Sequence, residues 1–397
     1  MSHAPSPCRP FRLHNAIQPY PWGSRGAEAF IPRLLGLPAA PEQPYAELWI
    51  GAHPHAPSRV FFGDEPLSLA TLIAREPVAM LGATVAQRFD NQLPFLFKVL
   101  SAAEPLSIQA HPDKVQAERL HARDPQHYPD ANHKPEVAIA LDRLTALAGL
   151  KSAEELRATL TAYPEIAAFM GKAGADPRES FITLIRQALA APQALSAASR
   201  RLAARLEQTP PPRPEAETLF LTLRPTYGDA DVGLLALFYL NLIHLEAGEG
   251  LYLPAGVPHA YVHGNLVECM ASSDNVVRVG LTHKFKDARA LLEILAPAVG
   301  PLPVLRPEPE APEVSYPTPM AEFEVRRLAL EMGARRAMGP RSSVEVYLLT
   351  EGRLQVSWSD GEEIFARGES FLIPACLPAW QLTALEKTTL FKVSVPA

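Results

Sequence analysis

The sequence predicts a mainly β protein with a helical region inserted near its middle. Segments with β-type composition occur before about residue 150 and again after about residue 215, with helix-type segments between them. The chain has 41 prolines in 397 residues, which fits a loop-rich and strand-rich architecture better than a helical bundle. A chain of this length is also sufficient for two or three domains with a sizeable core.

Residues 1–150 contain several short segments that are typical of strands. PFLFKVL, LSIQAH and EVAIAL are rich in β-branched and aromatic residues, and Pro, Asp or Gly bounds each of them. We therefore assign residues 1–150 to the first part of a β domain.

Residues 151–214 change to a helical pattern. Ser152 and Glu155 have the spacing of a capping box, in which the two side chains satisfy free backbone N–H groups at a helix start. Three segments with apolar residues at helical spacing follow, and the proline run TPPPRP then ends the block. Its arginines, including Arg205, either lie on a solvated face or belong to a lid over a pocket, and the sequence leaves both readings open.

The β pattern returns at residues 215–296, which we assign to the same β domain as residues 1–150. Residues 297–319 are dense in proline and are predicted to form a linker or an extended wrap over the surface. Residues 320–397 alternate apolar and polar side chains between glycine-containing turns, which predicts a second barrel or sandwich. The two β regions share a pattern, "GE" followed by an apolar strand that ends in LPA or IPA.

Composition excludes several classes of partner. The formal net charge of −6 argues against a nucleic-acid partner, so an anionic substrate needs a local basic cluster. Cys8, Cys269 and Cys376 are scattered without a CxxC pair, so we expect unpaired thiols in a reducing cytosol, although two of them can bridge. No signal-peptide core or membrane span is evident, and we expect a cytoplasmic monomer without a membrane partner.

One strand presents an unusual polar face. Side chains alternate along a strand, so the apolar residues of LSIQAH point one way while Ser107, Gln109 and His111 point the other way. A solvent-facing edge is the plain explanation for such a face. A hydroxyl, an amide and an imidazole directed at one space are the alternative.

Two further segments offer metal-binding groups in the same way. Lys134 and Glu136 share one face of NHKPEVAIAL, while His259, Tyr261 and His263 share a face after the turn of LYLPAGVPHAYVHGN. Nitrogen and oxygen ligands from several strands suit Zn²⁺ or another borderline divalent metal. The absence of cysteine ligands argues against a closed structural zinc site.

A basic cluster accompanies these groups. Arg278, Lys284 and Lys286 follow the histidine hairpin, and Lys98 and Lys134 come from earlier strands. Such cations, with a hydroxyl donor such as that of Ser107, suit a phosphate group. The alternative is a solvated basic loop. No GxxxxGK[ST] or GxGxxG sequence is evident, so nucleotide binding is not expected.

Six ordered motifs resemble type I mannose-6-phosphate isomerases. They are QPYPWGS, AELWIGAHP, LSIQAHPDK, NHKPEVAIAL, YLPAGVPHAY and ECMASSDNVVRVGLTHKFKD, between Gln18 and Asp287. The resemblance implies cupin-type jelly-roll barrels, one catalytic and one C-terminal, with an inserted helical domain. It also implies one zinc ion per chain, held by the matching residues Gln109, His111, Glu136 and His259.

The resemblance further implies the exchange of mannose 6-phosphate and fructose 6-phosphate by proton transfer through a cis-enediol. The implied catalytic residues are Arg278, Lys134 and Glu268, and the choice of general base stays open between the last two and the neighbours of His259. The expected substrate-binding residues are Ser107, Lys98, Tyr261 and Lys284. One departure from the family pattern is that GLTHK has His283 where the family often has proline.

Two other functions are compatible with such a barrel. An iron-dependent cupin oxygenase would bind Fe(II) and consume oxygen, which an isomerase does not need. A non-catalytic sugar-binding cupin would be expected to lose a ligand or the arginine, and this chain retains them all. The C-terminal β region shows no matching ligand set, so we expect it to be structural or interface-forming.

Overall fold

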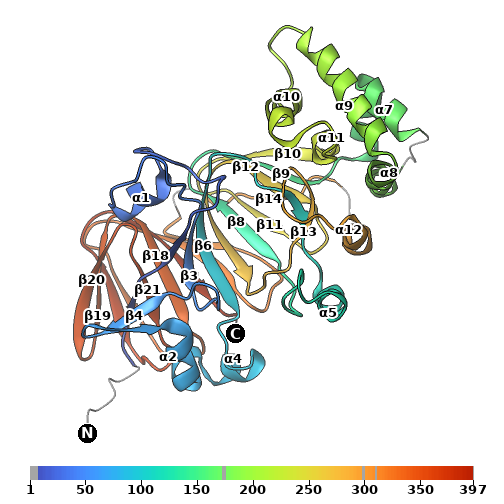
Figure 1. The fold of residues 1–397 in the computed structure, drawn as a ribbon. Helices are drawn as coiled ribbons and strands as arrows, with labels where there is room; N and C mark the ends of the chain where they lie inside the picture. Colours follow the sequence, from blue (N-terminus) through green and yellow to red (C-terminus); the bar gives the residue numbers. More distant parts are fainter. Residues whose placement is uncertain (1–7, 172–175, 297–299, 309–310, 397) are drawn as a thin grey trace.

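A computed structural model describes residues 8–171, 176–296, 300–308 and 311–396. Parts of the predicted segments lie outside these residues: 1–7 of the first β region, 172–175 of the helical block, and 297–299 and 309–310 of the linker. The described chain is rich in strands, and the helices α7–α10 gather at one end while the C-terminal strands gather at the other (Figure 1). Within the described residues, no helix has the length and apolar character needed to cross a membrane.

The central sheet has 11 strands, and β12 connects its two layers. The C-terminal part of β12 pairs with β6 and β8, while its N-terminal part pairs with β7 and β9. At the change of layer, Gly264 has φ +122°, and a Cβ there would lie 2.6 Å from the carbonyl oxygen of Arg143. The strands of this sheet are β2 (Ala16–Gln18), β3 (Glu47–Gly51), β6 (Phe95–Ala102), β7 (Ile108–Ala110), β8 (Glu136–Ala140), β9 (Leu144–Leu150), β10 (Leu240–Leu245), β11 (Gly250–Leu253), β12 (His259–Ala271), β13 (Val277–Gly280) and β14 (Val304–Leu305).

Strand alternation separates an apolar face from a polar face in this sheet. Phe97 and Val99 of β6 belong to the hydrophobic core that the central sheet shares with the C-terminal region. Lys98, between them, points to the opposite side and lines a cavity. The same alternation places the polar side chains of β8 and β12 in that cavity.

Helices form the inserted region, as predicted. Ser152 caps α6, and its side chain and that of Glu155 make the reciprocal hydrogen bonds of a capping box. TPPPRP separates α9 from α10, so the helical region continues past Pro214 into residues where we expected the β domain to resume. These helices are α6 (Ala153–Ala162), α7 (Pro164–Met170), α8 (Pro177–Ala190), α9 (Pro192–Glu207), α10 (Glu215–Tyr227) and α11 (Gly233–Ala236).

Shorter elements cover the rest of the central sheet. A two-stranded sheet, β4 and β5, precedes three helices that pack into the core shared with the C-terminal region. The two strands are β4 (Arg59–Phe62) and β5 (Glu65–Ser68), and the three helices are α2 (Leu69–Arg75), α3 (Pro77–Leu81) and α4 (Ala83–Arg88). The other short helices are α1 (Phe30–Leu35), which precedes β4, and α5 (Lys114–Arg123) and α12 (Ala288–Ile294), which follow later in the chain.

The C-terminal region consists of a six-stranded and a four-stranded sheet packed face to face, as the alternation predicts. Val346 and Leu348 face the central sheet, while Tyr347 and Leu349 fill the space between the two C-terminal sheets. The strands are β15 (Glu313–Tyr316), β16 (Glu324–Leu330), β17 (Arg335–Met338), β18 (Glu345–Glu351), β19 (Arg353–Trp358), β20 (Gly361–Ala366), β21 (Ser370–Ile373), β22 (Trp380–Ala384) and β23 (Thr388–Ser394), with β1 (Phe11–Leu13).

Two segments join sheets in ways that the sequence did not indicate. β1 lies within the residues that we assigned to the catalytic β domain, but it pairs with β21 of the C-terminal region. The proline-rich segment supplies β14 to the central sheet and β15 to the C-terminal sheet. It is therefore an extended connection that adds an edge strand on each side.

The expectation of unpaired thiols is wrong for two of the three cysteines. Cys8 and Cys376 form a disulfide, while Cys269 is free and buried in β12. The pairing of β1 with β21 brings Cys8 close to Cys376, because the two residues lie just beyond the ends of these paired strands. Scattered positions in the sequence concealed this proximity.

Candidate active site

A cavity of about 500 Å³ lies on the polar side of the central sheet. Of the residues predicted for the site, nine line this cavity: Lys98, Ser107, Gln109, Lys134, Glu136, Tyr261, Glu268, Arg278 and Lys284. His111 and His259 are buried beside Glu136, where their rings lie 5.1 Å apart. The structure thus brings together all of the predicted site residues.

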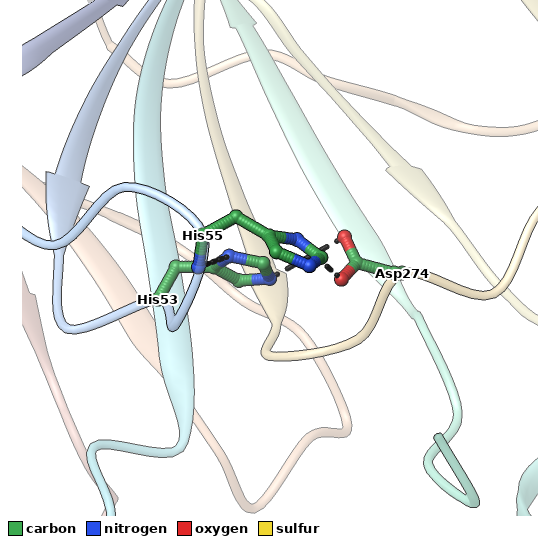
Figure 2. Close-up of side chains that lie close together, drawn as sticks. All are labelled: His53, His55 and Asp274. Carbon is green, nitrogen blue, oxygen red and sulfur yellow. Dashed lines mark hydrogen bonds and ion pairs between the residues drawn. The ribbon is translucent and has the colours of Figure 1, made fainter. Parts of the chain in front are cut away.

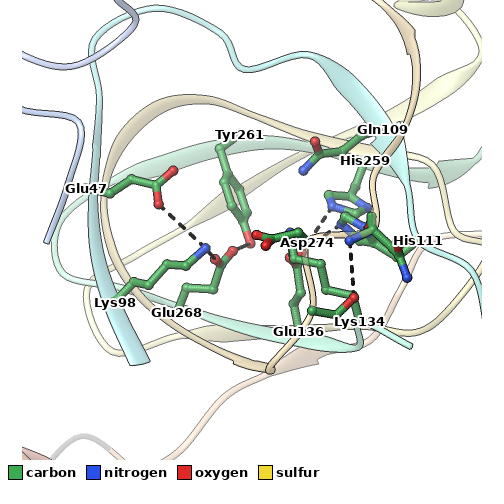
Figure 3. Close-up of polar contacts among 12 residues, drawn as sticks. Glu47, Lys98, Gln109, His111, Lys134, Glu136, His259, Tyr261, Glu268 and Asp274 are labelled. Carbon is green, nitrogen blue, oxygen red and sulfur yellow. Dashed lines mark hydrogen bonds and ion pairs between the residues drawn. The ribbon is translucent and has the colours of Figure 1, made fainter. Parts of the chain in front are cut away.

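Two histidines and one glutamate form a buried cluster beside this cavity (Figure 3). His111 Nε2 lies 3.4 Å from Glu136 Oε1, and His259 Nε2 lies 3.3 Å from Glu136 Oε2. Two ligands of a tetrahedral zinc ion, each bonded at about 2.0–2.1 Å, are separated by about 3.3 Å. The spacing of the three side chains therefore fits the coordination of a small divalent metal.

Hydrogen bonds fix which ring nitrogen of each histidine faces Glu136. The Nδ1–H of His111 donates to the carbonyl oxygen of Asn275 at 2.8 Å, and that of His259 donates to the carbonyl of Val257 at 2.9 Å. In the neutral form of each ring, Nε2 therefore carries a lone pair directed at the cluster. Both Nε2 atoms and Glu136 Oε2 are buried without a hydrogen-bond partner, which is costly unless an ion occupies the space between them.

Gln109 is the fourth side chain that the resemblance implies for this cluster. It pairs with His259 across β7 and β12, and Figure 3 shows its amide beside the His259 ring. Its Oε1 accepts a hydrogen bond from the Ser107 hydroxyl at 3.4 Å. Ser107 and Gln109 therefore face the same cavity, as the alternation along the strand predicts.

The protonation states of the cluster also suit a metal. Burial lowers the pKa of His111 to about 4, which keeps the imidazole neutral and able to bind a cation. Burial by itself would raise the pKa of Glu136, but His111 and the nearby Lys134 lower it well below its ordinary value. Lys134 Nζ lies 3.3 Å from Glu136 Oε1. The cluster thus offers a neutral imidazole from His111, the imidazole of His259 and a carboxylate.

A second polar network surrounds Glu268 (Figure 3). The Tyr261 hydroxyl donates to Glu268 Oε1 at 2.8 Å, and Lys98 Nζ donates to Glu268 Oε2 at 3.2 Å. Burial, followed by the charge of Glu136, raises the pKa of Glu268 despite these donors. A buried carboxyl group with a raised pKa is a typical general acid–base group.

Lys98 forms ion pairs with two carboxylates, those of Glu47 and Glu268. Its Nζ also lies 3.6 Å from Glu47 Oε2, and that carboxylate accepts from the Trp49 indole N–H at 2.6 Å. Burial would lower the pKa of Lys98, but Glu47 and Glu268 raise it well above its ordinary value. Lys98 is therefore a fixed cation that orients Glu268, which does not favour its predicted contact with a substrate phosphate.

Two other cations have no such partners. Arg278 pairs with Gln109 across β13 and β7, and both Arg278 and Lys284 line the cavity. Burial lowers the pKa of each, and the charge of Arg278 lowers the pKa of Lys284 further. Within the described residues, neither side chain forms an ion pair with a carboxylate. This corner of the cavity therefore favours an anion.

The sequence patterns did not identify some of the residues that line the cavity. Glu47 and Trp49 belong to the motif AELWIGAHP, and their alternation in β3 was the available signal for a shared polar face. Asp274 reaches the cavity from the loop between β12 and β13, where strand alternation gives no guidance. The end of α10 contributes Tyr227, so the helical region does form part of the cavity wall. His263 is exposed and lies outside the cavity.

Comparisons with known proteins agree on one family. The family model "Phosphomannose isomerase type I, catalytic domain" matches residues 10–153. Mannose-6-phosphate isomerase 2 of Arabidopsis thaliana is 37% identical over 394 residues, which covers 92% of this chain and 88% of the relative. The human mannose-6-phosphate isomerase is 40% identical over 312 residues, covering 72% of this chain and 73% of the relative.

Solved structures show the same architecture. A point variant of phosphomannose isomerase from Salmonella typhimurium superposes with a TM-score of 0.84 at 32% identity, covering 98% of this chain and 100% of that chain. A mannose 6-phosphate isomerase bound with zinc and yttrium superposes with a TM-score of 0.80 at 30% identity, with the same coverage. The predicted cupin-type fold with a helical insertion is confirmed. The chain therefore belongs to the type I phosphomannose isomerase family, and it is an isomerase enzyme.

Proposed function

We propose that this isomerase interconverts mannose 6-phosphate and fructose 6-phosphate and holds one zinc ion through Gln109, His111, Glu136 and His259. The observation that carries the proposal is the convergence of three buried ligand atoms without hydrogen-bond partners beside a cavity that also contains two unpaired cations. The names of the relatives supply the sugar phosphate as substrate. When bound, the zinc ion supplies a Lewis acid that stabilises negative charge on the sugar oxygens.

Glu268 is the group that we assign to proton transfer between carbons. The carboxylate removes the proton from C2 of the open-chain aldose while Lys134 gives a proton to the C1 oxygen, which yields the cis-enediol. Glu268 then returns its proton to C1 while the C2 hydroxyl gives its proton back to Lys134 and becomes the ketone. The raised pKa of Glu268 brings it closer to the range in which a group can both accept and donate a proton.

Lys134 and Arg278 act on the oxygens in this proposal. Lys134 Nζ lies beside Glu136, and its charge also acts on Glu268, so it is placed to exchange a proton with a sugar oxygen. Arg278 emerges next to Gln109 and acts as a fixed positive charge opposite the developing enediol oxygens. Such fixed charges lower the barrier because they need no reorganisation during the reaction.

The phosphate is assigned to the part of the cavity that Lys284 lines. Lys284 has no carboxylate partner among the described residues, and the Ser107 hydroxyl lies in the same cavity. The Lys284 ammonium lies 5.1 Å from the centre of the Tyr20 ring, which orients the side chain along the cavity wall. Tyr261, which we predict as a substrate contact, lines the cavity, and its hydroxyl donates a hydrogen bond to Glu268.

The first experiment measures conversion of mannose 6-phosphate to fructose 6-phosphate by the purified chain, before and after chelation, with zinc content determined on the same sample. We expect activity to disappear with removal of one zinc ion and to return when zinc is added. Folded, zinc-loaded protein without turnover would contradict the substrate assignment. Activity that survives complete metal removal would contradict the assigned role of zinc.

A further inference from the structure

A second cluster of metal-binding side chains lies at the edge of the cavity (Figure 2). His53, His55 and Asp274 each offer one ligand atom, and these atoms lie within 4.8 Å of one another. His53 Nε2 is 3.4 Å from Asp274 Oδ1, and His55 Nδ1 is 3.2 Å from Asp274 Oδ2. These separations are similar to those in the cluster around Glu136 and to the spacing of about 3.3 Å between ligands of a tetrahedral zinc ion.

The surrounding structure holds two of these side chains in place. His53 is 4% exposed and packs edge-on against Trp49, with the ring centres 4.9 Å apart. Asp274 follows β12 in a loop that Asp130 anchors, because the backbone N–H of Asp274 donates to Asp130 Oδ2 at 2.7 Å. The backbone that carries the carboxylate is therefore held by a contact that needs no cation.

His55 differs because it is exposed and therefore accessible from solvent. Its ring lies 5.3 Å from that of His53, and both rings reach toward the same carboxylate.

We propose that His53, His55 and Asp274 form a second site for Zn²⁺ or a similar borderline divalent cation at the rim of the substrate cavity. Two imidazoles and a carboxylate are a usual ligand set for such ions, and solvent can complete the coordination. This site is separate from the one around Glu136. It shares the Asp274 carboxylate with the wall of the substrate cavity.

The second site is expected to bind a cation less tightly than the first, because the ring proton of His53 lies on the nitrogen that would bind the cation. His53 Nδ1 accepts a long hydrogen bond of 3.4 Å from the backbone N–H of His55, so the ring proton lies on Nε2, the nitrogen that faces Asp274. Cation binding at Nε2 moves that proton to Nδ1 and breaks the long contact. In His111 and His259 the proton is already on Nδ1, so these rings need no such change.

The test compares the purified chain with His55→Ser and with His263→Ser, which removes an exposed histidine outside the cavity as a matched control. Each protein is dialysed against graded Zn²⁺ and analysed for bound metal, and Co²⁺ titrations follow the visible absorption of each site. We expect a tight and a weak equivalent in the unmodified chain and in His263→Ser. His55→Ser is expected to keep the tight equivalent and to bind the weak one at least about tenfold less tightly.

Each other outcome is decisive. A weak equivalent that persists unchanged in His55→Ser, or a chain that binds only one ion, overturns the second site, and the cluster then serves only to orient Asp274. Loss of a weak equivalent in His55→Ser without any tight equivalent would support this site while contradicting the zinc site around Glu136. Activity is not needed as a readout, so the two proposals fail separately.

Discussion

The two β regions contain the same short structural unit but direct different side chains into their interiors. Residues 247–261, AGEGLYLPAGVPHAY, and residues 366–380, ARGESFLIPACLPAW, share the Gly-Glu turn and the LPA or IPA ending. In both turns the glutamate side chain accepts from a backbone N–H three residues earlier, Glu249 at 2.9 Å and Glu369 at 2.7 Å. Gly248 and Gly368 have nearly equal φ values of +88° and +85°.

The side chains of the two regions differ immediately after this unit. When the two segments are aligned on the shared LPA and IPA, Ala379 falls at the position of His259, and Trp380 then enters the C-terminal core. Tyr347 stacks on Phe371 with ring centres 4.7 Å apart and meets Trp380 edge-on. One region therefore surrounds a cavity with buried charges, while aromatic rings fill the other. The shared backbone unit does not determine function, which depends on the side chains directed inward.

The largest expected effect comes from making the two regions alike at one position. His259→Ala gives the central region the residue found at position 379 and removes one ligand of the proposed zinc site. We expect loss of bound zinc and a decrease in kcat/KM of at least about 10³-fold, because Lewis-acid stabilisation contributes several kcal/mol. Metal analysis and steady-state kinetics measure both effects, and His263→Ala is the control. Normal zinc content in His259→Ala would disprove the assignment.

A second change separates metal binding from proton transfer. Glu268→Gln keeps the shape of the side chain but removes the carboxylate that we assign to carbon proton transfer. We expect kcat to fall by about 10²–10⁴-fold while zinc content and thermal stability stay close to those of the unmodified chain. Exchange of the C2 proton with solvent, followed by NMR, should decrease in parallel. Unchanged exchange would move the base assignment to Lys134.

A substitution in the C-terminal core should lower the stability of the protein without changing its activity. Phe371→Ala removes a fully buried ring between the two C-terminal sheets and leaves a cavity. We expect a loss of about 3–5 kcal/mol in the free energy of unfolding, measured in denaturant. Zinc content and KM measured well below the unfolding transition should not change. A large increase in KM would show that the C-terminal core controls the substrate cavity.

A smaller change tests the environment of Glu268. Tyr261→Phe removes the hydroxyl that donates to Glu268 Oε1 at 2.8 Å. A donor stabilises the charged form of a carboxyl group, so its removal raises the pKa of Glu268 further. Glu268 must be ionised to remove the C2 proton, so the acidic limb of the kcat/KM–pH profile should move to higher pH. A limb that stays in place or moves to lower pH would argue against Glu268 as the titrating base.

The smallest effects should be equal in the two regions. Glu249→Ala and Glu369→Ala each remove one turn hydrogen bond and one ion pair with an arginine, Arg306 or Arg12 respectively. Each is expected to lower the free energy of unfolding by about 1 kcal/mol, since neither glutamate is fully buried. Unequal losses would show that the shared turn supports the two regions differently.

The parts of the site that the sequence predicts are those that follow from local periodicity. Alternation along β7 and β8 places Gln109 and Glu136 on inward faces, because successive side chains of any strand point to opposite sides. Asp274 and His53 come from loops, whose paths depend on contacts such as that with Asp130. No periodic pattern encodes these positions.

Long-range pairing is the other part that the sequence does not reveal. β1 carries only three paired residues, and its partner β21 follows more than 350 positions later. Nothing in FRL distinguishes β21 from a strand of the nearer sheet as its partner. The helical extension past Pro214 has a similar cause, because a proline run ends one helix without preventing another from starting.

The pairing of β1 with β21 has a consequence for how the chain is made. During synthesis Phe11–Leu13 leaves the ribosome first, but Ser370–Ile373 follows only when the chain is almost complete. The C-terminal sheet therefore lacks this edge strand until nearly the whole polypeptide has emerged, whereas the strands that hold the proposed zinc ligands are all present by about residue 280. A nascent chain can assemble its metal cluster before that sheet is complete.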